Sequence, residues 1–185
     1  MGCGLDDLFN RVNNNECKGF NIDLEDVINA RNELLPPLEN ETNIVCDLND
    51  TSWFEKIPYE NGVILVALGV FYYFEEKAVI EFLRKVKELG NVEVIFDTVS
   101  KFGMKQTRKY MKQLGKDDAL MYFYVEDIND LLKKLGNEVQ LLDNHDYYEW
   151  VTDKSKFNFI TRISMKISDK FHMVKMIHLK LYEED

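Results

Sequence analysis

The stretch GVILVALG, residues 62–69, is an uninterrupted run of apolar residues bounded by glycines. Such a run is typical of a β-strand that is buried on both faces, as in a parallel sheet. The following residues 75–90, EEKAVIEFLRKVKELG, repeat apolar side chains at helical spacing and end in a glycine. Residues 92–100, VEVIFDTVS, then predict another buried strand that carries Asp97 near its end. Strand, helix and strand in this order predict a right-handed βαβ unit.

The same alternation of predicted strands and helices extends along the chain in both directions. The last predicted strand alternates apolar and polar residues, which favours an antiparallel partner near a sheet edge. We therefore expect one α/β domain over residues 1–185, with a mainly parallel sheet and an antiparallel closing strand. The further strands are expected at residues 18–23, 42–48, 138–143 and 173–183, and the further helices at residues 24–35 and 126–136.

Composition excludes several classes of protein. A net charge of −10 repels phosphate backbones, so we expect no nucleic-acid partner. The longest apolar run, residues 63–74, is too short to span a bilayer, and we expect no membrane contact. Three cysteines without a signal-like start indicate a reducing, cytoplasmic location. His172 and His178 form no recognisable metal-ligand pattern, and we predict no metal site.

A glycine turn and two strand-end acids indicate a nucleoside site. Gly2 and Gly4 let a ligand approach the backbone, because no Cβ stands in the way. Asp23 and Asp47 end the next two strands, where a carboxylate can accept hydrogen bonds from ribose hydroxyls or an adenine amino group. Asp7 stands where a dinucleotide site needs a third glycine, and its charge repels pyrophosphate. S-adenosylmethionine, which has no phosphate, fits better; the simpler alternative for Asp23 is a helix N-cap.

Five segments together resemble the leucine carboxyl methyltransferase and tetracenomycin-type polyketide O-methyltransferase family. This family is a branch of the class I S-adenosylmethionine-dependent methyltransferases, and the resemblance implies a Rossmann-like methyltransferase sheet. The segments are GCGLD (2–6), NIDLEDVINARNELLP (21–36), DLNDTSWF (47–54), GVFYYF (69–74) and VIFDTVS (94–100).

The resemblance also implies the cofactor site, residue by residue. The glycine turn would line the methionine portion, Asp23 would hold the ribose, and Asp47 would flank the adenine. The segment from Gly69 to Tyr73 would lie under the reacting centre. The implied cofactor-binding residues are Gly2, Cys3, Gly4, Asp23, Leu24, Asp47, Leu48, Leu68 and Gly69.

The reaction implied is transfer of a methyl group from S-adenosylmethionine to a hydroxyl or carboxyl oxygen of a small molecule. A carboxylate acceptor needs no base, whereas a hydroxyl acceptor does. Tyr72 and Tyr73 are candidates for this role, although aromatic packing is the more frequent explanation of such residues. No residue is assigned as catalytic from the sequence.

A second hypothesis is a non-catalytic module. Relatives carry a glutamate where this chain has Leu68, which cannot accept a hydrogen bond. They also have a region before the glycine turn that supplies the first strand of the sheet. We expect this strand to be missing or replaced here. A truncated relative would bind a partner or self-associate through exposed sheet edges.

Overall fold

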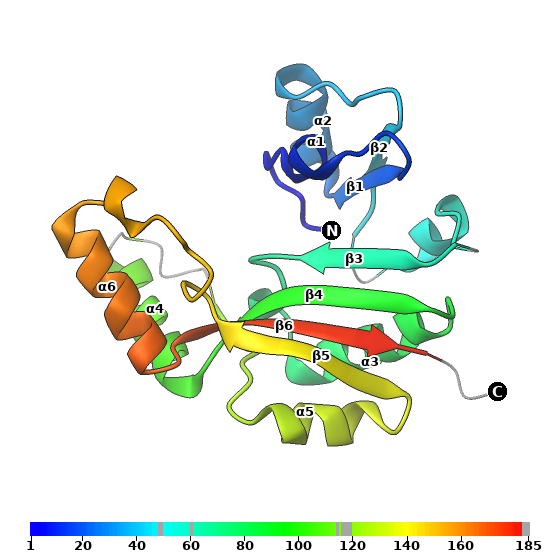
Figure 1. Ribbon diagram of the computed structural model, residues 1–185. Helices are drawn as coiled ribbons and strands as arrows, with labels where there is room; N and C mark the ends of the chain where they lie inside the picture. Colours follow the sequence, from blue (N-terminus) through cyan, green and yellow to red (C-terminus); the bar gives the residue numbers. More distant parts are fainter. Residues whose placement is uncertain (48–49, 60, 114, 116–119, 183–185) are drawn as a thin grey trace.

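The computed structural model describes residues 1–47, 50–59, 61–113, 115 and 120–182. Its largest feature is a four-stranded sheet in the order β3 (Val63–Ala67), β4 (Val92–Val99), β6 (Val174–Leu181) and β5 (Val139–Asp146) (Figure 1). β3 and β4 are parallel, whereas β6 is antiparallel to both of its neighbours. The predicted α/β fold with an antiparallel closing strand is confirmed.

A separate pair of parallel strands forms the amino-terminal part. It consists of β1 (Gly19–Asp23) and β2 (Glu41–Val45), joined by α2 (Glu25–Leu34) and preceded by the short α1 (Leu8–Val12). Figure 1 shows β1 facing β3 across a gap. Within the described residues no strand lies between them.

Two amphipathic helices build the core against the four-stranded sheet. α3 (Glu76–Lys87) and α5 (Ile128–Leu135) turn their apolar stripes inward, so that Leu83 and Val86 are fully buried. They meet the inward side chains of the strands, including Val94 and Phe96, in one cluster. Each such side chain contributes about 1.5–3 kcal/mol when it leaves water.

α4 (Lys101–Gln113) and α6 (Phe159–Lys170) lie together at one end of the sheet, beyond the end of β3 (Figure 1). The remaining elements are the 3₁₀ turns η1 (Ser52–Lys56), η2 (Phe71–Tyr73) and η3 (Lys154–Lys156). Sequence analysis did not predict α6. Much of the apolar side of this helix faces solvent; Ile160, for example, is 75% exposed. None of the described helices is both long and apolar enough to cross a membrane.

Three local expectations need correction. Asp23 does not cap α2, since Leu24 is the N-cap residue and makes no side-chain cap. The second strand ends at Val45, before Asp47. β3 is not buried on both faces: Ile64 is 65% exposed, because the described helices α3 and α5 cover only the opposite face of this strand.

Candidate functional site

The glycine turn lies at the carboxyl ends of β1 and β3. The Met1 nitrogen donates to the carbonyl of Val66 at 2.8 Å. Two residues later, the Cys3 amide donates to the carbonyl of Ile22 at 3.3 Å. One short segment is thus attached to both sheets, and it stands where ligands bind in open α/β folds.

Asp23 is joined directly to this turn. Its Oδ2 accepts from the Gly4 amide at 2.8 Å, and its Oδ1 accepts from the Leu24 amide at 2.8 Å. A carboxylate has about four lone-pair positions, so each oxygen retains capacity for a further donor such as a ribose hydroxyl. The structure therefore brings together the glycine turn and the acid that sequence analysis paired.

The two glycines serve different purposes. Gly2 has φ +57°, and a Cβ there would lie 2.3 Å from Cγ2 of Val70, so both the backbone conformation and the lack of space disfavour a larger residue. Gly4 has φ +49°, and a Cβ there would meet nothing within 4 Å. The turn is tight on one side and open on the other, where a ligand can approach.

Between these glycines, Cys3 presents a neutral thiol. Burial raises the pKa of the Cys3 thiol above its ordinary value. The thiol is therefore protonated near neutral pH, and Cys3 lines the turn without acting as a nucleophile.

A buried arginine, which sequence analysis missed, fixes the shape of the turn. Arg31 of α2 donates through Nη1 to the carbonyls of Gly4 and Asp6, at 3.1 and 2.6 Å. Its Nη2 lies 3.4 Å from Oε1 of Glu41, and both side chains are buried. The available signal was the position of Arg31 three residues after Ile28, on the buried face of α2.

Glu41 is held ionised beside this arginine. Burial alone would raise its pKa, but hydrogen bonds from the Leu38 amide and the Asn21 side chain, together with Arg31, hold the pKa of Glu41 below its usual value. The arginine charge is thus balanced inside the protein, and its remaining contribution is to hold the turn carbonyls in place.

Asp47 lies two residues beyond the end of β2. The neighbouring Cys46 amide donates to the Asp23 carbonyl at 2.9 Å, so both acids stand at the same sheet edge. Asp47 is exposed, and its carbonyl accepts from the Asp50 amide at 2.9 Å. Leu48, the other predicted adenine contact, lies outside the described residues.

The end of β3 forms the floor of the same edge. Leu68 is half-buried, and Gly69 has φ +70°, where a Cβ would meet nothing within 4 Å. The Gly69 amide donates to Oδ1 of Asp97 at 2.6 Å, and the Tyr72 hydroxyl donates to Oδ2 at 2.5 Å. Asp97 of β4 therefore ties the Gly69 turn to η2.

This contact decides what Tyr72 can do. Burial raises the pKa of Tyr72 far above its ordinary value, and the nearby Asp97 carboxylate adds to the effect. Burial also raises the pKa of Asp97 itself. Tyr72 is therefore a permanent hydrogen-bond donor rather than a phenolate base, whereas Tyr73 is 52% exposed at the surface.

Aromatic residues after β5 extend this edge. Burial, with the Asp97 carboxylate nearby, raises the pKa of Tyr147. The ring of Trp150 stacks on His145 with centroids 3.9 Å apart, and Trp150 is 66% exposed. Sequence analysis did not predict this stack, because four residues lie between His145 and Trp150 and the chain turns there.

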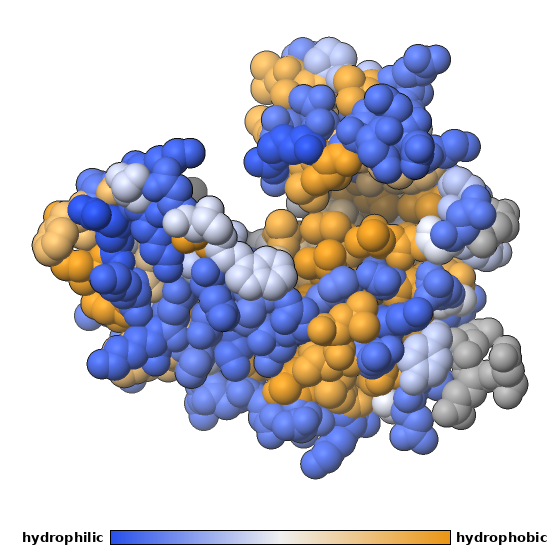
Figure 2. All heavy atoms as spheres, in the orientation of Figure 1, coloured by the Kyte–Doolittle hydropathy of each residue, from blue (hydrophilic) through white to orange (hydrophobic). Residues whose placement is uncertain are grey.

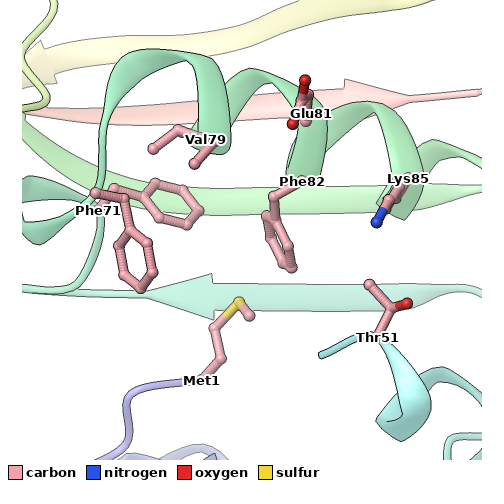
Figure 3. A pocket seen from close by; sticks show the side chains of 9 residues that line it. Met1, Thr51, Phe71, Val79, Glu81, Phe82 and Lys85 are labelled. Atoms are coloured by element: carbon pink, nitrogen blue, oxygen red, sulfur yellow. The ribbon is translucent and has the colours of Figure 1, made fainter. Parts of the chain in front are cut away.

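A small cavity lies on the α3 side of Met1, away from Asp23. It has a volume of about 100 Å³, and Phe71, Phe82 and Val79 form its apolar wall (Figure 3). Glu81, Lys85 and Thr51 also line it, and the Met1 side chain projects toward it (Figure 3). It is too small for a nucleoside, and it belongs to the packing beneath the amino-terminal segment.

Comparison with known proteins supports the family resemblance. No protein-family model matches the sequence. The tetracenomycin polyketide synthesis O-methyltransferase TcmP of Streptomyces glaucescens is 29% identical over 101 residues, which are 54% of this chain and 37% of that protein. The chain therefore spans little more than a third of this curated relative.

Solved structures show the same fold. An S-adenosylmethionine-dependent methyltransferase from Mesorhizobium loti matches with a TM-score of 0.65 and 14% identity, over 97% of this chain and 88% of that one. NcsB1, an O-methyltransferase of neocarzinostatin biosynthesis solved with S-adenosylmethionine and 2-hydroxy-5-methyl naphthoic acid, matches with a TM-score of 0.57 and 12% identity, over 97% of this chain and 47% of that one. The chain shares the Rossmann-like α/β fold of these two proteins.

Proposed function

We propose that the protein transfers a methyl group from S-adenosylmethionine to a hydroxyl or carboxyl oxygen of a small molecule. The observation that carries this proposal is the 2.8 Å contact between the Gly4 amide and Asp23 at the carboxyl edge of the sheet. It joins a turn that is open to a ligand to a carboxylate that can accept from ribose. The sequence relative is an O-methyltransferase, which supports the same chemistry.

The residues present suit this cofactor. The open sides of Gly4 and Gly69 leave room for backbone contact with its amino-acid portion. Asp23, followed by the exposed Leu24, would hold the ribose, and Asp47 would accept from the adenine amino group beside Leu48. Gly2 and Cys3 would line the methionine portion, and Leu68 would lie beneath it. Acidic side chains at this edge favour a cationic sulfonium over a phosphate.

The bound cofactor would supply an electrophilic methyl group, and the protein would align the acceptor oxygen with it. Asp97 and Tyr72 would keep the Gly69 turn rigid at the reacting centre, because their contacts are short and buried. Tyr72 would donate a hydrogen bond rather than remove a proton. Tyr73, being exposed, would face the acceptor side. A carboxylic acid acceptor, ionised at neutral pH, needs no base.

The setting that we propose for this activity is the cytoplasm. Cys3, Cys17 and Cys46 are free thiols, as expected in a reducing compartment. The acidic chain would not take nucleic acid as a partner, and we propose no membrane role. Residues 1–185 would work as a single domain, and self-association would use the open edge strands.

The second candidate is a module that binds a partner without catalysis. Leu68 favours it because an apolar side chain cannot accept a hydrogen bond from the cofactor. The gap between β1 and β3 also favours it, because the described strands form two separate sheets. This candidate predicts no binding of S-adenosylmethionine.

Isothermal titration with S-adenosylmethionine distinguishes the two. We expect saturable heat from the wild type and from Asp26→Asn, an exposed acid on α2, and at least tenfold weaker binding by Asp23→Asn. A second step follows radioactive methyl transfer to a panel of small phenols and aromatic carboxylic acids. Absence of heat at millimolar cofactor refutes the proposal for this chain. Absence of heat also supports the non-catalytic module, whereas saturable binding by the wild type contradicts it.

A further inference from the structure

The end of the molecule that α4 and α6 form is basic, although the chain as a whole has a net charge of −10. α4 carries five lysine and arginine side chains and no acid, and α6 carries three and a single acid, Asp169. All eight basic residues are exposed. Among the described residues, none of the eight forms an ion pair with a carboxylate. The positive charge of this end is therefore not compensated within the protein.

α6 also turns its apolar side chains toward solvent. A helix of a globular protein normally buries its apolar stripe against the core. In α6 the buried residues are instead Met165 and Ser168. The large apolar side chains of the helix and of its C-cap are exposed, and their spacing places them along one side: Phe159, Ile160, Ile163, Ile167 and Phe171. We call these five residues the α6 stripe.

The α6 stripe continues onto α4 and has cations beside it. The ring of Phe102, an exposed residue of α4, lies with its centroid 5.9 Å from that of Phe171. On α6, the cations Arg162, Lys166 and Lys170 follow one another at every fourth position, so they form a row next to the stripe. Figure 1 shows α6 in front of α4 at this end, and Figure 2 shows apolar and hydrophilic atoms side by side there.

This combination is typical of an interaction surface. Single exposed apolar residues are common, but a continuous exposed stripe on a soluble protein marks a site where another molecule binds. Apolar side chains on the partner would cover the stripe, and carboxylates would lie opposite Arg162, Lys166 and Lys170. An amphipathic helix offers both groups, because its side chains three and four positions apart share a face. A partner helix of about twelve residues is about 18 Å long and matches the 12 residues of α6.

The charges favour a short acidic helix over the other occupants of such a surface. Charges more than about 8–10 Å apart are largely screened in physiological salt, so a single helix on α6 responds to the nearby cations. An anionic bilayer extends over the whole molecule and also meets its acidic remainder. A second copy that packed α6 against α6 would bring two rows of cations together.

We propose that the α6 stripe and its row of cations bind an acidic amphipathic helix of another polypeptide. α4 and α6 lie beyond the end of β3, so the bound helix would stand at the end of the sheet to which the strand end carrying Gly69 points (Figure 1). The proposal does not depend on methyl transfer, because it concerns residues outside the candidate cofactor site.

The test uses a fluorescein-labelled peptide of about 14 residues, with leucines on one side of the helix and glutamates along the other. In one control peptide glutamine replaces every glutamate; a second control keeps the composition but distributes the leucines around the helix. Fluorescence anisotropy of each peptide is followed during titration with the full chain. We expect saturable binding of the first peptide and about tenfold weaker binding of each control. Equal binding of all three peptides, or no saturable binding at millimolar protein, overturns the proposal.

Two pairs of protein variants locate the binding surface. Lys166→Glu reverses a cation of the α6 row, and Lys133→Glu makes the same change of net charge at an exposed lysine of α5 that forms no ion pair among the described residues. We expect about tenfold weaker peptide binding by Lys166→Glu and wild-type binding by Lys133→Glu. Likewise, Ile160→Ser should weaken binding, whereas Leu34→Ser, at an exposed position of α2, should not. An equal effect within either pair contradicts binding at α6.

The other occupants are tested directly. The protein is sedimented with phosphatidylserine vesicles and, in a separate experiment, alone at increasing concentration. We expect no binding to the vesicles and no self-association that depends on Ile160. Vesicle binding that Ile160→Ser abolishes overturns a polypeptide partner in favour of a lipid surface. A dimer that Ile160→Ser dissociates overturns it in favour of a second copy of the chain.

Discussion

Replacing Arg31 by methionine tests how the glycine turn is held. The substitution keeps an unbranched apolar stem but removes the donors to Gly4 and Asp6 and the partner of Glu41. Removing one partner of a buried ion pair costs about 3–5 kcal/mol, because the other charge is left uncompensated. The three contacts share one guanidinium, so their individual values do not add. We expect Arg31→Met to lower the free energy of unfolding by about 3–5 kcal/mol, a large part of the roughly 5–15 kcal/mol of a typical domain.

Urea unfolding followed by circular dichroism measures this change, provided that the slope against urea stays constant. The double variant Arg31→Met with Glu41→Gln removes both charges, and we expect it to be about 1–2 kcal/mol more stable than Arg31→Met alone. The pH dependence gives an independent check. The folded pKa of Glu41 is lowered, so its contribution is present above about pH 4.3 and is lost as the pH falls through the folded pKa.

A cost of less than about 1 kcal/mol for Arg31→Met, which is the range of an exposed ion pair, would contradict a buried pair of Arg31 and Glu41. Further destabilisation of the Arg31→Met protein by Glu41→Gln would contradict it as well. An exposed arginine of α1, Arg11, provides the matched control. Arg11→Met removes contacts to Asp6 and Asp7 and should change stability by no more than about 1 kcal/mol.

Further predictions concern the turn and the floor of the site. Gly2→Ala places alanine in a left-handed backbone conformation and against Val70, and should lower the free energy of unfolding, measured in urea, by about 2–4 kcal/mol. Gly4→Ala causes the same backbone strain but has open space around it, and should lower the free energy of unfolding by about 1–2 kcal/mol. An equal loss of stability in the two variants would show that Val70 does not confine the turn. A further prediction concerns Asp97. The folded pKa of Asp97 is raised, so its contribution to stability is present below about pH 3.9 and is lost as the pH rises through the folded pKa. Asp97→Asn should therefore gain stability relative to wild type between about pH 4 and pH 7, and a constant difference over this range would contradict burial of the carboxylate.

Long periodic segments could be predicted from the sequence because local pattern and burial agree there. The run at 62–69, the helix at 75–90 and the strand at 92–100 each appear in the structure as β3, α3 and β4. The alternation at 173–183 correctly predicted an antiparallel strand, β6. The approach of Asp23 to Gly4 was also predictable, since both follow the carboxyl edge of one sheet.

What could not be predicted depends on contacts between distant segments. The exposure of Ile64 reflects an uncovered sheet face, which no local pattern records. Arg31 looks like an ordinary helix residue until Gly4 and Glu41 are placed around it. The raised pKa of Tyr72 follows from its burial and, in addition, from its contact with Asp97, 25 residues away in sequence. The apolar side of α6 is largely exposed, and this exposure depends on which elements pack against the helix, so the sequence alone does not show it.

The most direct test of the site is to locate S-adenosylmethionine by amide chemical shifts. A titration of isotopically labelled protein should shift the amides of Gly4, Leu24 and Gly69 together and saturably. Asp23→Asn should abolish these shifts, whereas Asp26→Asn should keep them. Saturable shifts confined to the α4 and α6 end, or equal shifts in the Asp23→Asn protein, would contradict an adenosine site at the glycine turn.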